Sequence, residues 1–374
     1  MKLVIISHTP HYKKNGVIVG WGSTIAEVNH LTKLFSEIYH IAPLHNEAAP
    51  DSSLAYESEK IKFIPISTYG GVNLKDKLSV LTTAPGNLKT ISSVLKKSGS
   101  NDWIQFRAPT AMGMYVIPYL SFFRKSKLWV KYAGNWNMDN PPLSYKFQKW
   151  WLENNFQNSK VTINGYWEGQ KSHIINFQNP CMDSEELLKA KEKSKNKNFD
   201  GKLSICFVGA LSKNKGVDLI LESLVKIKDS SEIDKVVFAG DGIERSKYEK
   251  LSKKINVEIE FTGFINRKEL ELIYEKSHII VLPSESEGFP KVIAEAAAYG
   301  CVPVVSDVSS ISQYFDETKA YLLKNINSSE LTDKINQAFS NRSKLKIMSE
   351  NCVRDSEKFT YEHYLKSLSD KILI

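Results

Sequence analysis

The sequence predicts an α/β fold built from two doubly wound domains, and three observations support this prediction. Apolar, β-branched runs alternate with longer amphipathic segments throughout the 374 residues. Such alternation is typical of parallel sheets covered by helices on both faces. A polar, lysine-rich stretch interrupts it near the middle of the chain, as expected at a domain boundary. No repeat of solenoid length is visible, so we expect two open α/β domains that face each other across a cleft.

The expected strands are short and rich in β-branched residues. In the first half of the chain they are Lys2–Ser7, Ile61–Pro65, Trp103–Arg107, Leu128–Ala133 and Lys160–Asn164. In the second half they are Leu203–Gly209, Lys235–Ala239, Val257–Thr262, His278–Pro283 and Val302–Ser306. Amphipathic patterns predict helices at Thr24–Tyr39, Val217–Lys228, Arg267–Lys276 and Pro290–Tyr299. Because ligands of such sheets bind at the carboxyl ends of the strands, we expect the functional motifs there.

The predicted domain boundary lies at residue 180. Asn179-Pro180 is a turn signal, and the segment ELLKAKEKSKNKNFDGK that follows combines a polar helical pattern with a loop. We therefore assign residues 1–180 to an N-terminal domain and residues 181–355 to a C-terminal domain. The last residues, 356–374, contain the helical pattern FTYEHYLKSLSDKIL.

The positive charge of the chain is unevenly distributed. Residues 1–180 contain 20 Lys and Arg against 11 Asp and Glu, whereas residues 181–374 contain 30 against 31. This excess favours an anionic partner for the first half, which is nucleic acid, a membrane surface or a phosphorylated substrate. A basic surface that is merely solvated is the alternative.

Cysteine usage and hydropathy exclude several classes of protein. The four cysteines form no CxxC motif or Cys/His cluster, so neither a zinc site nor a disulfide framework is indicated. The most apolar stretch, Met112–Phe123, is far shorter than the roughly 20 residues that span a bilayer. The first residues, MKLVIISHTP, have the pattern of a strand and not of a secretory signal. We therefore expect a cytoplasmic protein that is not integral to a membrane.

The segment SESEGFPKVIAEAAAYG contains the most informative spacing in the chain. It follows the buried strand pattern HIIVLP, so Glu287 is expected in a loop and Glu295 in the second turn of a helix that Pro290 begins. Gly288 has no side chain, so a ligand can approach the backbone closely. The free N–H groups from Phe289 onward can bind an anion. Carboxylates accept hydrogen bonds from sugar hydroxyls. An anion flanked by hydroxyl groups describes a nucleotide sugar.

A second phosphate-binding signal precedes this segment. FVGALSKNKGVDLILESL is a strand, a loop and a helix, and its loop contains Gly209, Lys213, Lys215 and Gly216. Lysines in such a turn can neutralise a diphosphate, although the spacing is not that of a Walker A motif. The segments AGDG, with Gly240, and FTGF end the next two strands. Glycine at the end of three successive strands is expected to keep one edge of the sheet open.

Taken in order, these motifs resemble the retaining glycosyltransferase family 4. The resemblance rests on FVGxLxxxKGxD, AGDG, FTGF and LPSxxEGFPxVxxEAxAxGxxPVV, which fall between Leu203 and Ser306. It implies the GT-B fold, in which two Rossmann-like doubly wound domains face a central cleft. The final pattern at 356–374 resembles the terminal helix of that family, which crosses back to the N-terminal domain.

The resemblance also implies roles for individual residues. Glu287 would contact the donor sugar, Glu295 the ribose hydroxyls, and Lys215 the diphosphate. The wider donor site implied in this way contains Gly209, Lys213, Lys215, Gly240, Phe264, Ile265, Glu287, Gly288, Phe289, Pro290, Lys291 and Glu295. Phe264 and Ile265 would lie beside the nucleobase. For Lys213, an exposed loop position without a role is the alternative.

The sequence departs from the family pattern at two places. Ala210 stands where the family usually has an arginine after the glycine of its strand end. The missing cation would be supplied by Lys213 or Lys291. Ala133-Gly134 takes the place of the family's histidine-glycine pair, so the side chain at the transferred carbon is either absent or replaced by Asn135. Asn135, Glu287 and Lys215 are the expected catalytic residues.

The acceptor is expected to bind the N-terminal domain. Gly20 and Gly22 precede a helix with a capping-box pattern, in which Glu27 would complete the cap, and occupy the family's usual position for a loop that approaches both substrates. His8 lies at the mouth of the first strand, where a catalytic and a packing role both remain open. Arg107 ends a strand and would hold an acceptor phosphate, with a structural salt bridge as the alternative.

Aromatic and basic residues are interleaved in PPLSYKFQKWWLENNF. On a helix, Tyr145, Lys149, Trp150 and Trp151 would form one aromatic and basic face. Such a face suits the headgroup layer of an anionic membrane, so we expect peripheral contact with the inner face of the plasma membrane. A core position for the two tryptophans is the alternative.

The function that the resemblance implies is transfer of a hexose from a nucleoside diphosphate sugar, with UDP expected, to a hydroxyl of a lipid-linked glycan in cell-surface polysaccharide biosynthesis. We expect a retaining, metal-independent enzyme without cofactors, because no DxD motif occurs in the chain. Nucleic acid is not an expected partner. A catalytically degenerate GT-B scaffold protein, supported by Ala133 and Ala210, and a GT-B nucleotide-sugar epimerase are the alternatives.

Overall fold

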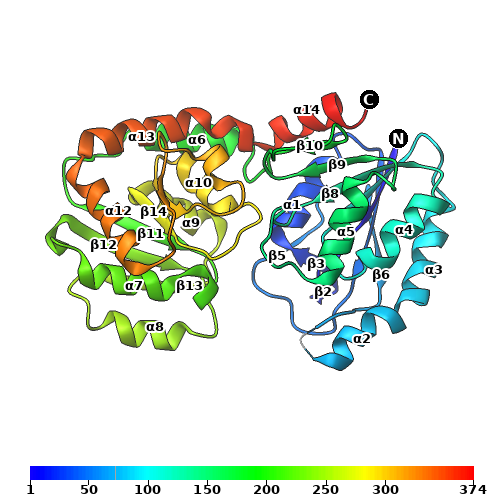
Figure 1. Cartoon of the computed structure of the whole chain (residues 1–374), viewed down its shortest axis with the longest axis horizontal. Coiled ribbons are helices and arrows are strands. Elements are labelled where there is room, and N and C mark those ends of the chain that lie inside the picture. The colour runs from blue at the N-terminus through cyan, green and yellow to red at the C-terminus, as the bar shows by residue number, and fades with distance from the viewer. Residues whose placement is uncertain (72) are drawn as a thin grey trace. The chain divides into compact units, whose positions relative to one another are not determined.

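The computed structural model describes residues 1–71 and 73–374 and divides into two compact units (Figure 1). Unit 1 comprises Met1–Phe177 and Leu365–Ile374, and unit 2 comprises Gln178–Tyr364. The division after residue 177 lies three residues before the boundary that the sequence suggests. Each unit contains its own parallel sheet and its own hydrophobic core.

Unit 1 is built on a seven-stranded parallel sheet in the order β10-β9-β8-β7-β1-β4-β6. Its strands are β1 (Lys2–Ile6), β4 (Glu37–Pro43), β6 (Ile61–Ile66), β7 (Trp103–Ala108), β8 (Lys127–Tyr132), β9 (Lys160–Ile163) and β10 (Ile174–Asn176). A small antiparallel sheet contains β2 (His11–Lys14), β3 (Val17–Trp21) and β5 (Ser53–Ala55). The helices are α1 (Gly22–Leu31), α2 (Leu74–Thr82), α3 (Ala84–Leu95), α4 (Gly113–Phe123) and α5 (Leu143–Glu153).

Unit 2 is built on a six-stranded parallel sheet in the order β13-β12-β11-β14-β15-β16. Its strands are β11 (Leu203–Val208), β12 (Ile233–Ala239), β13 (Ile259–Gly263), β14 (Ile279–Leu282), β15 (Val302–Ser306) and β16 (Tyr321–Leu323). Its helices are α6 (Ser184–Ser194), α7 (Val217–Lys226), α8 (Arg245–Ser252), α9 (Arg267–Lys276), α10 (Lys291–Ala298), α11 (Ile311–Tyr314), α12 (Ser328–Ser340) and α13 (Arg342–Arg354). The last helix, α14 (Tyr361–Lys371), begins in unit 2, and its residues from Leu365 belong to unit 1.

Every strand predicted from the sequence is present, but one predicted helix is too long. Helix α1 ends at Leu31, and Glu37–Pro43, which the prediction partly included in that helix, is strand β4. Leu31, Leu34 and Ile38 have the spacing of a helical stripe, which explains the error. Strand β4 pairs with both β1 and β6, so its residues are buried by the sheet on either side.

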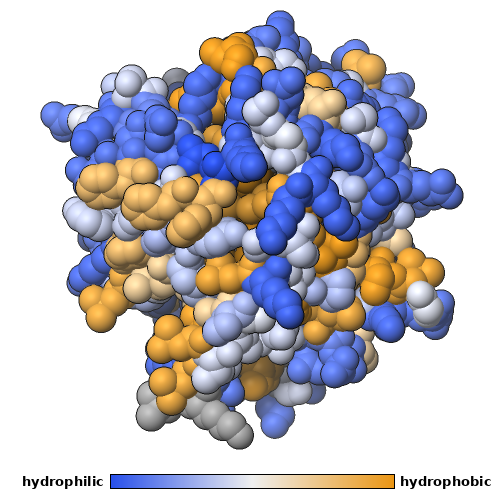
Figure 2. All heavy atoms as spheres, turned by 90° about the vertical axis from the view of Figure 1, so that its right-hand side faces the viewer, coloured by the Kyte–Doolittle hydropathy of each residue, from blue (hydrophilic) through white to orange (hydrophobic). Residues whose placement is uncertain are grey.

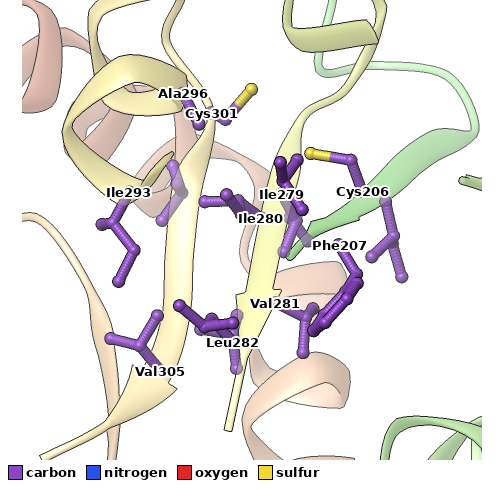
Figure 3. Packing of buried hydrophobic residues seen from close by; sticks show 14 of the residues in the cluster. Cys206, Phe207, Ile279, Ile280, Val281, Leu282, Ile293, Ala296, Cys301 and Val305 are labelled. Carbon is purple, nitrogen blue, oxygen red and sulfur yellow. The ribbon is translucent and has the colours of Figure 1, made fainter. Parts of the chain in front are cut away.

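The core of unit 2 fixes the position of α10. Figure 3 shows Ile293 and Ala296 of this helix beside the strand that carries Val305, which pairs with the strand that carries Ile279–Leu282. These residues are buried, with at most 2% of their surface exposed. Full burial of an isoleucine or leucine side chain contributes about 2 kcal/mol. This packing holds the helix that follows the Glu287 loop firmly on the sheet.

Among the described residues, no helix combines the length and apolar character that crossing a membrane would require.

Candidate functional site

Three glycines end neighbouring strands at the carboxyl edge of the unit 2 sheet. Gly209 follows β11, Gly240 follows β12 and Gly263 ends β13. The N–H group of Gly240 donates to the carbonyl of Gly263 at 3.0 Å, and a Cβ atom on Gly240 would lie 2.0 Å from the carbonyl oxygen of Gly209. Gly240 also has φ of 137°, which favours glycine. Backbone therefore packs directly on backbone here, and no side chain of these residues covers the edge.

An ion pair joins two loops of this edge. Lys215 lies in the 3₁₀ turn Lys213–Lys215 after β11, and Glu287 lies in the loop after β14. The Nζ atom of Lys215 is 2.5 Å from Oε1 of Glu287. The N–H group of Glu285 donates to the carbonyl of Asn214 at 3.0 Å, which ties the same loops through their main chains. The cation and the carboxylate expected to hold the diphosphate and the sugar are therefore neighbours within one unit.

Gly216 allows these two loops to approach closely. It has φ of 73° and is the N-cap residue of α7. A Cβ atom at this position would lie 2.5 Å from the carbonyl oxygen of Pro283, so a larger residue would push the loops apart. The glycine of the lysine-glycine pair is thus required by packing as well as by backbone conformation.

The amino end of α10 follows the Glu287 loop directly. Pro290 is the N-cap residue and Lys291 the first helical residue, one position later than predicted. No side chain caps this end, so N–H groups of the first turn and the positive end of the helix dipole face the loop. The hydroxyl of Ser309 donates to the carbonyl of Gly288 at 3.4 Å. Anion binding at this helix end stays a prediction.

The side chain of Phe289 points into the core and not toward the predicted anion-binding site. Its ring packs against Tyr314 and Phe359, with centroids 5.4 and 5.3 Å away. Only the main chain of Phe289 is therefore left to contact a ligand at the loop.

Glu295 belongs to a second, more buried cluster. Its Oε1 is 2.7 Å from Nη1 of Arg267, and its Oε2 accepts a hydrogen bond from the Tyr274 hydroxyl at 3.2 Å. Burial alone would lower the pKa of Arg267, but Glu295 and Glu186 raise it above its ordinary value. Burial and the charge of Glu295 raise the pKa of Tyr274. A carboxylate can accept about four hydrogen bonds, so Glu295 keeps acceptor capacity for hydroxyls.

The other predicted donor residues lie at the same carboxyl edge. Phe264 directly follows β13 and is 49% exposed, whereas Ile265 packs partly against the core of unit 2. Lys213 is exposed, and Lys291 is half-buried. The ring of Phe264 is therefore accessible for the predicted contact with the nucleobase of the donor.

Unit 1 contains a buried charge cluster that sequence reasoning missed. Glu27 of α1 accepts hydrogen bonds from Arg107 of β7 at 2.9 Å and from Lys131 of β8 at 2.7 Å. All three residues are buried. The prediction that Glu27 completes a capping box is wrong, because the N-cap residue of α1 is Trp21. The salt-bridge alternative for Arg107 is present, and a phosphate contact by this residue stays a prediction.

The predicted acceptor glycines lie in regular structure. Gly20 is in β3 and Gly22 begins α1, so they do not form the expected loop. A Cβ atom would lie 2.7 Å from the His11 ring at Gly20 and 2.5 Å from the carbonyl of Ser52 at Gly22. Both positions are thus small because other parts of unit 1 pack against them.

His8 and Asn135 follow strands of unit 1. His8 follows β1 and is exposed. Asn135 lies in the loop after β8, where its Oδ1 accepts from the N–H group of Asn137 at 3.1 Å. A cavity of about 170 Å³ beside this loop is lined by Asn135 together with Tyr132, Trp136 and Tyr145. Their predicted catalytic and acceptor roles stay predictions.

Helix α5 presents only part of the predicted aromatic face. Trp150 is half exposed, whereas Trp151 packs on the core and donates its Nε1–H to Ser121 at 3.1 Å. Lys149 lies 5.4 Å above the ring of Trp136 and donates to Asn137 at 2.9 Å. The core alternative therefore describes Trp151 better, and Trp150 is the aromatic residue of the pair that reaches solvent.

The part of the chain that carries the predicted donor residues matches a known family. Residues 189–354 match the family model described as "Glycosyl transferases group 1". These residues include Lys215, Glu287 and Glu295 and lie within unit 2. Residues 189–354 are therefore similar to the glycosyl transferases group 1 family.

Curated relatives share part of the chain. The O-antigen biosynthesis glycosyltransferase WclY of Escherichia coli is 30% identical over 194 residues, which cover 49% of this chain and 51% of that protein. A Campylobacter jejuni protein, GalNAc-alpha-(1->4)-GalNAc-alpha-(1->3)-diNAcBac-PP-undecaprenol alpha-1,4-N-acetyl-D-galactosaminyltransferase, is 29% identical over 132 residues, which cover 35% and 34%. The chain thus spans about half or less of the length of these relatives.

Solved structures match the whole chain in fold. Sucrose-phosphate synthase from Thermosynechococcus elongatus superposes with a TM-score of 0.71 at 14% identity, covering 99% of this chain and 97% of that one. Anabaena HepE in complex with UDP superposes with a TM-score of 0.68 at 13% identity, covering 99% of each chain. The predicted fold class, a GT-B arrangement of two Rossmann-like units, is confirmed.

Proposed function

We propose that the chain is a retaining glycosyltransferase of family 4. It moves a hexose from a nucleoside diphosphate sugar, with UDP as the expected nucleotide, to a hydroxyl of a lipid-linked glycan. It acts in cell-surface polysaccharide biosynthesis on the cytoplasmic side of the membrane. The observation that carries the proposal is the contact of Lys215 with Glu287 beside the uncapped amino end of α10.

In the proposal, Lys215 and Glu287 each bind a different part of the donor. The diphosphate takes the cation of Lys215 and the N–H groups at the start of α10, which are oriented before the ligand arrives. The sugar hydroxyls donate to the Glu287 carboxylate, which loses Lys215 as its partner when the diphosphate binds. The ribose hydroxyls donate to Glu295, which Arg267 and Tyr274 already hold in place.

The proposed reaction is a substitution at the anomeric carbon. The bond between this carbon and the diphosphate oxygen breaks, and a bond to the acceptor oxygen forms on the same face of the sugar. The proton of the acceptor hydroxyl passes to the departing phosphate. Lys215 and the helix amino end stabilise the negative charge that develops on the leaving group, without a bound metal. Asn135 is assigned to the transferred sugar on its motif position alone.

The two relatives support the choice of acceptor. One is named for O-antigen biosynthesis, and the other is named for a reaction on an undecaprenol-linked glycan. A lipid-linked acceptor lies in a membrane, so the basic character of unit 1 and the exposed Trp150 fit peripheral contact with an anionic surface.

A binding or scaffold protein is the second candidate. Ala210 in place of the usual arginine favours it, because the donor diphosphate has one cation fewer. Lys213 and Lys291 supply the missing charge in the transferase proposal.

Thermal unfolding with UDP-, GDP-, ADP- and dTDP-glucose, each with and without magnesium, tests the proposal. A ligand at 100 times its dissociation constant stabilises the folded state by about 2.7 kcal/mol, so one nucleotide sugar should raise Tm by several degrees. Lys215→Met should abolish the rise. Lys213→Met, which removes a lysine two residues away in the same 3₁₀ turn, should reduce it only in part. NMR of the product should show a retained anomeric configuration. An inverted product, or the absence of any shift, contradicts the transferase proposal.

A further inference from the structure

A cavity of about 490 Å³ opens at the amino ends of the strands β7, β8 and β9 in unit 1. Four cationic side chains line it: Arg124, Lys125, Lys127 and Lys160. The first residues of β8 and β9 are Lys127 and Lys160, and Arg124 directly follows α4. This edge of the sheet is opposite to the carboxyl ends at which Arg107 and Asn135 lie, so the cavity is separate from the acceptor residues predicted in unit 1.

No side-chain carboxylate forms an ion pair with any of the four cations within the part of the chain that the structure describes. No carboxylate side chain lines the cavity. None of the four forms an ion pair within 4.0 Å with a described residue, whereas the nearby Lys149 pairs with Glu153. Burial lowers the pKa of Arg124 and of Lys160, as expected for partly buried cations that lack an acidic neighbour. The cavity is therefore a local concentration of positive charge.

Two of these cations are held in place by main-chain carbonyls. Arg124 donates to the carbonyl of Leu120 at 3.0 Å and to that of Asn158 at 2.8 Å. Lys160 donates to the carbonyl of Lys371, near the end of α14, at 2.5 Å. A guanidinium has five donors and an ammonium three, so both groups keep donors for an anion. Because the side chains are already ordered, binding an anion would cost little additional side-chain entropy.

Exposed aromatic rings occur close in sequence to residues that line the cavity. Phe122 and Phe123, the last residues of α4, precede Arg124 directly and are 72% and 70% exposed. Trp150 and Phe156 are about half exposed, and their rings lie 5.2 Å apart. The Phe122 ring also contacts Trp151 edge-on, with 6.3 Å between centroids, which links the two groups. Figure 2 shows hydrophobic patches directly beside hydrophilic side chains on the face of the molecule that is turned toward the viewer.

We propose that this cavity binds the phosphate of an anionic membrane phospholipid while Phe122 and Phe123 enter the interfacial layer. At a bilayer surface the lipid phosphates lie above the acyl chains. Basic side chains can bind the phosphates while neighbouring aromatic rings enter the boundary with the acyl chains. A free phosphate would use the cations but would leave the two phenylalanines exposed to water. Unit 1 contains 22 Lys and Arg against 12 Asp and Glu, so its overall charge also favours an anionic surface.

The proposal deepens the membrane contact proposed above, because it names the lipid group and the residues that hold it. It does not depend on the transfer reaction. The residues involved belong to unit 1, whereas Lys215 and Glu287 belong to unit 2. Loss of lipid binding with intact donor binding, or the reverse, therefore distinguishes failure of one proposal from failure of the other.

Flotation with vesicles tests the proposal. The full chain should float with phosphatidylcholine vesicles that contain about 30% phosphatidylglycerol and should not float with pure phosphatidylcholine. Each lysine near the surface contributes about a factor of 5, so Lys125→Gln with Lys127→Gln should weaken binding about 25-fold. The matched control is Lys13→Gln with Lys89→Gln, which removes the same charge from exposed residues of unit 1 outside the cavity and should retain most of the binding.

A second pair of variants tests the aromatic part. Phe122→Ser with Phe123→Ser keeps all charges and should also release the chain from the vesicles, and urea unfolding should show that both double variants remain folded. Glycerol phosphate at millimolar concentration should not displace the wild-type chain from vesicles. Equal losses in the cavity and control lysine variants would overturn the proposal. So would unchanged flotation of the phenylalanine variant, or binding of glycerol phosphate with no binding to vesicles, which would indicate a soluble phosphate ligand.

Discussion

Lys215 and Glu287 are 72 residues apart in the sequence, and their charged groups lie 2.5 Å apart in the structure. The contact joins the loop after β11 to the loop after β14, and Gly216 lets these loops approach. Both side chains are largely screened from solvent, so each depends on the other for a partner. A donor that carries both a diphosphate and hydroxyl groups can replace both partners at once, whereas a free phosphate or a free sugar can replace only one.

The first prediction follows from this exchange of partners. Lys215→Met should reduce kcat/KM for donor turnover about 100-fold, because one preorganised cation that stabilises the leaving group is lost. Glu287→Gln should preserve affinity for the free nucleoside diphosphate but weaken binding of the nucleotide sugar. Calorimetry with UDP and with a UDP-sugar separates the two effects. Equal loss of both ligands in Glu287→Gln would contradict the assignment of this residue to the sugar.

The second prediction concerns Arg267, which holds Glu295 in place. Arg267→Met leaves the largely buried carboxylate of Glu295 without its cation, so we expect the free energy of unfolding of unit 2 to fall by about 2 kcal/mol. Arg267 is partly exposed, which places the estimate below that for a fully buried pair. Urea unfolding measures the change. Arg267→Lys should recover part of it, and the double variant Arg267→Met with Glu295→Gln should be more stable than the single variant.

Much of the donor site could be predicted because its signal is local in sequence. Glu287 and Glu295 follow one strand, and Lys215 and Gly216 follow another, so strand pattern and glycine placement locate all four at the carboxyl edge. The same reasoning placed the three glycines at Gly209, Gly240 and Gly263, which the structure brings into backbone contact.

The clusters formed across elements could not be predicted in this way. The sequence pattern places Arg267 at the start of a helix, but in the structure it pairs with Glu295, 28 positions later. The pattern around Glu27 predicts a helix cap, but Glu27 binds Arg107 and Lys131 on two strands. Capping patterns depend on neighbours in sequence, whereas buried charges depend on which strands lie side by side. A glutamate at an otherwise buried helix position, with cations at neighbouring strand ends, is the signal that could have indicated such a cluster.

The third prediction concerns Gly240, where backbone packs on backbone. Gly240→Ala places a Cβ atom 2.0 Å from the carbonyl oxygen of Gly209 and requires φ of 137° from a residue that disfavours it. We expect a loss of at least about 2 kcal/mol in the free energy of unfolding of unit 2. Gly201→Ala is the matched control, because a Cβ atom there would meet no heavy atom within 4 Å. Urea unfolding of the two variants, followed by the same probe, should therefore diverge, and equal stability would show that the loop adapts at little cost.

The fourth prediction concerns acid sensitivity of unit 1. His11 is buried, its Nδ1 bonds to the carbonyl of Thr9 at 2.8 Å, and its Nε2 bonds to the Tyr56 hydroxyl at 2.7 Å. The same hydroxyl bonds to His40 at 2.7 Å. Burial lowers the pKa of His11 to about 4, and burial followed by the charge of His11 lowers the pKa of His40. Two adjacent histidines are therefore neutral in the folded protein.

The sign of the effect follows from the unfolded chain, in which a histidine has a pKa of about 6.5. Between that value and about 4, the unfolded chain binds protons that the folded unit does not, so the free energy of unfolding falls as the pH falls. Protonation linked to His11 should lower the free energy of unfolding by about 1.4 kcal/mol for each pH unit in this window. Above about pH 6.5 this loss is absent, because His11 is neutral in both the folded and the unfolded chain. Urea unfolding at pH 7.5 and 5.0 should show the loss, and His11→Gln should make the dependence shallower. An equally steep dependence in His11→Gln would mean that the acid sensitivity of unit 1 arises elsewhere.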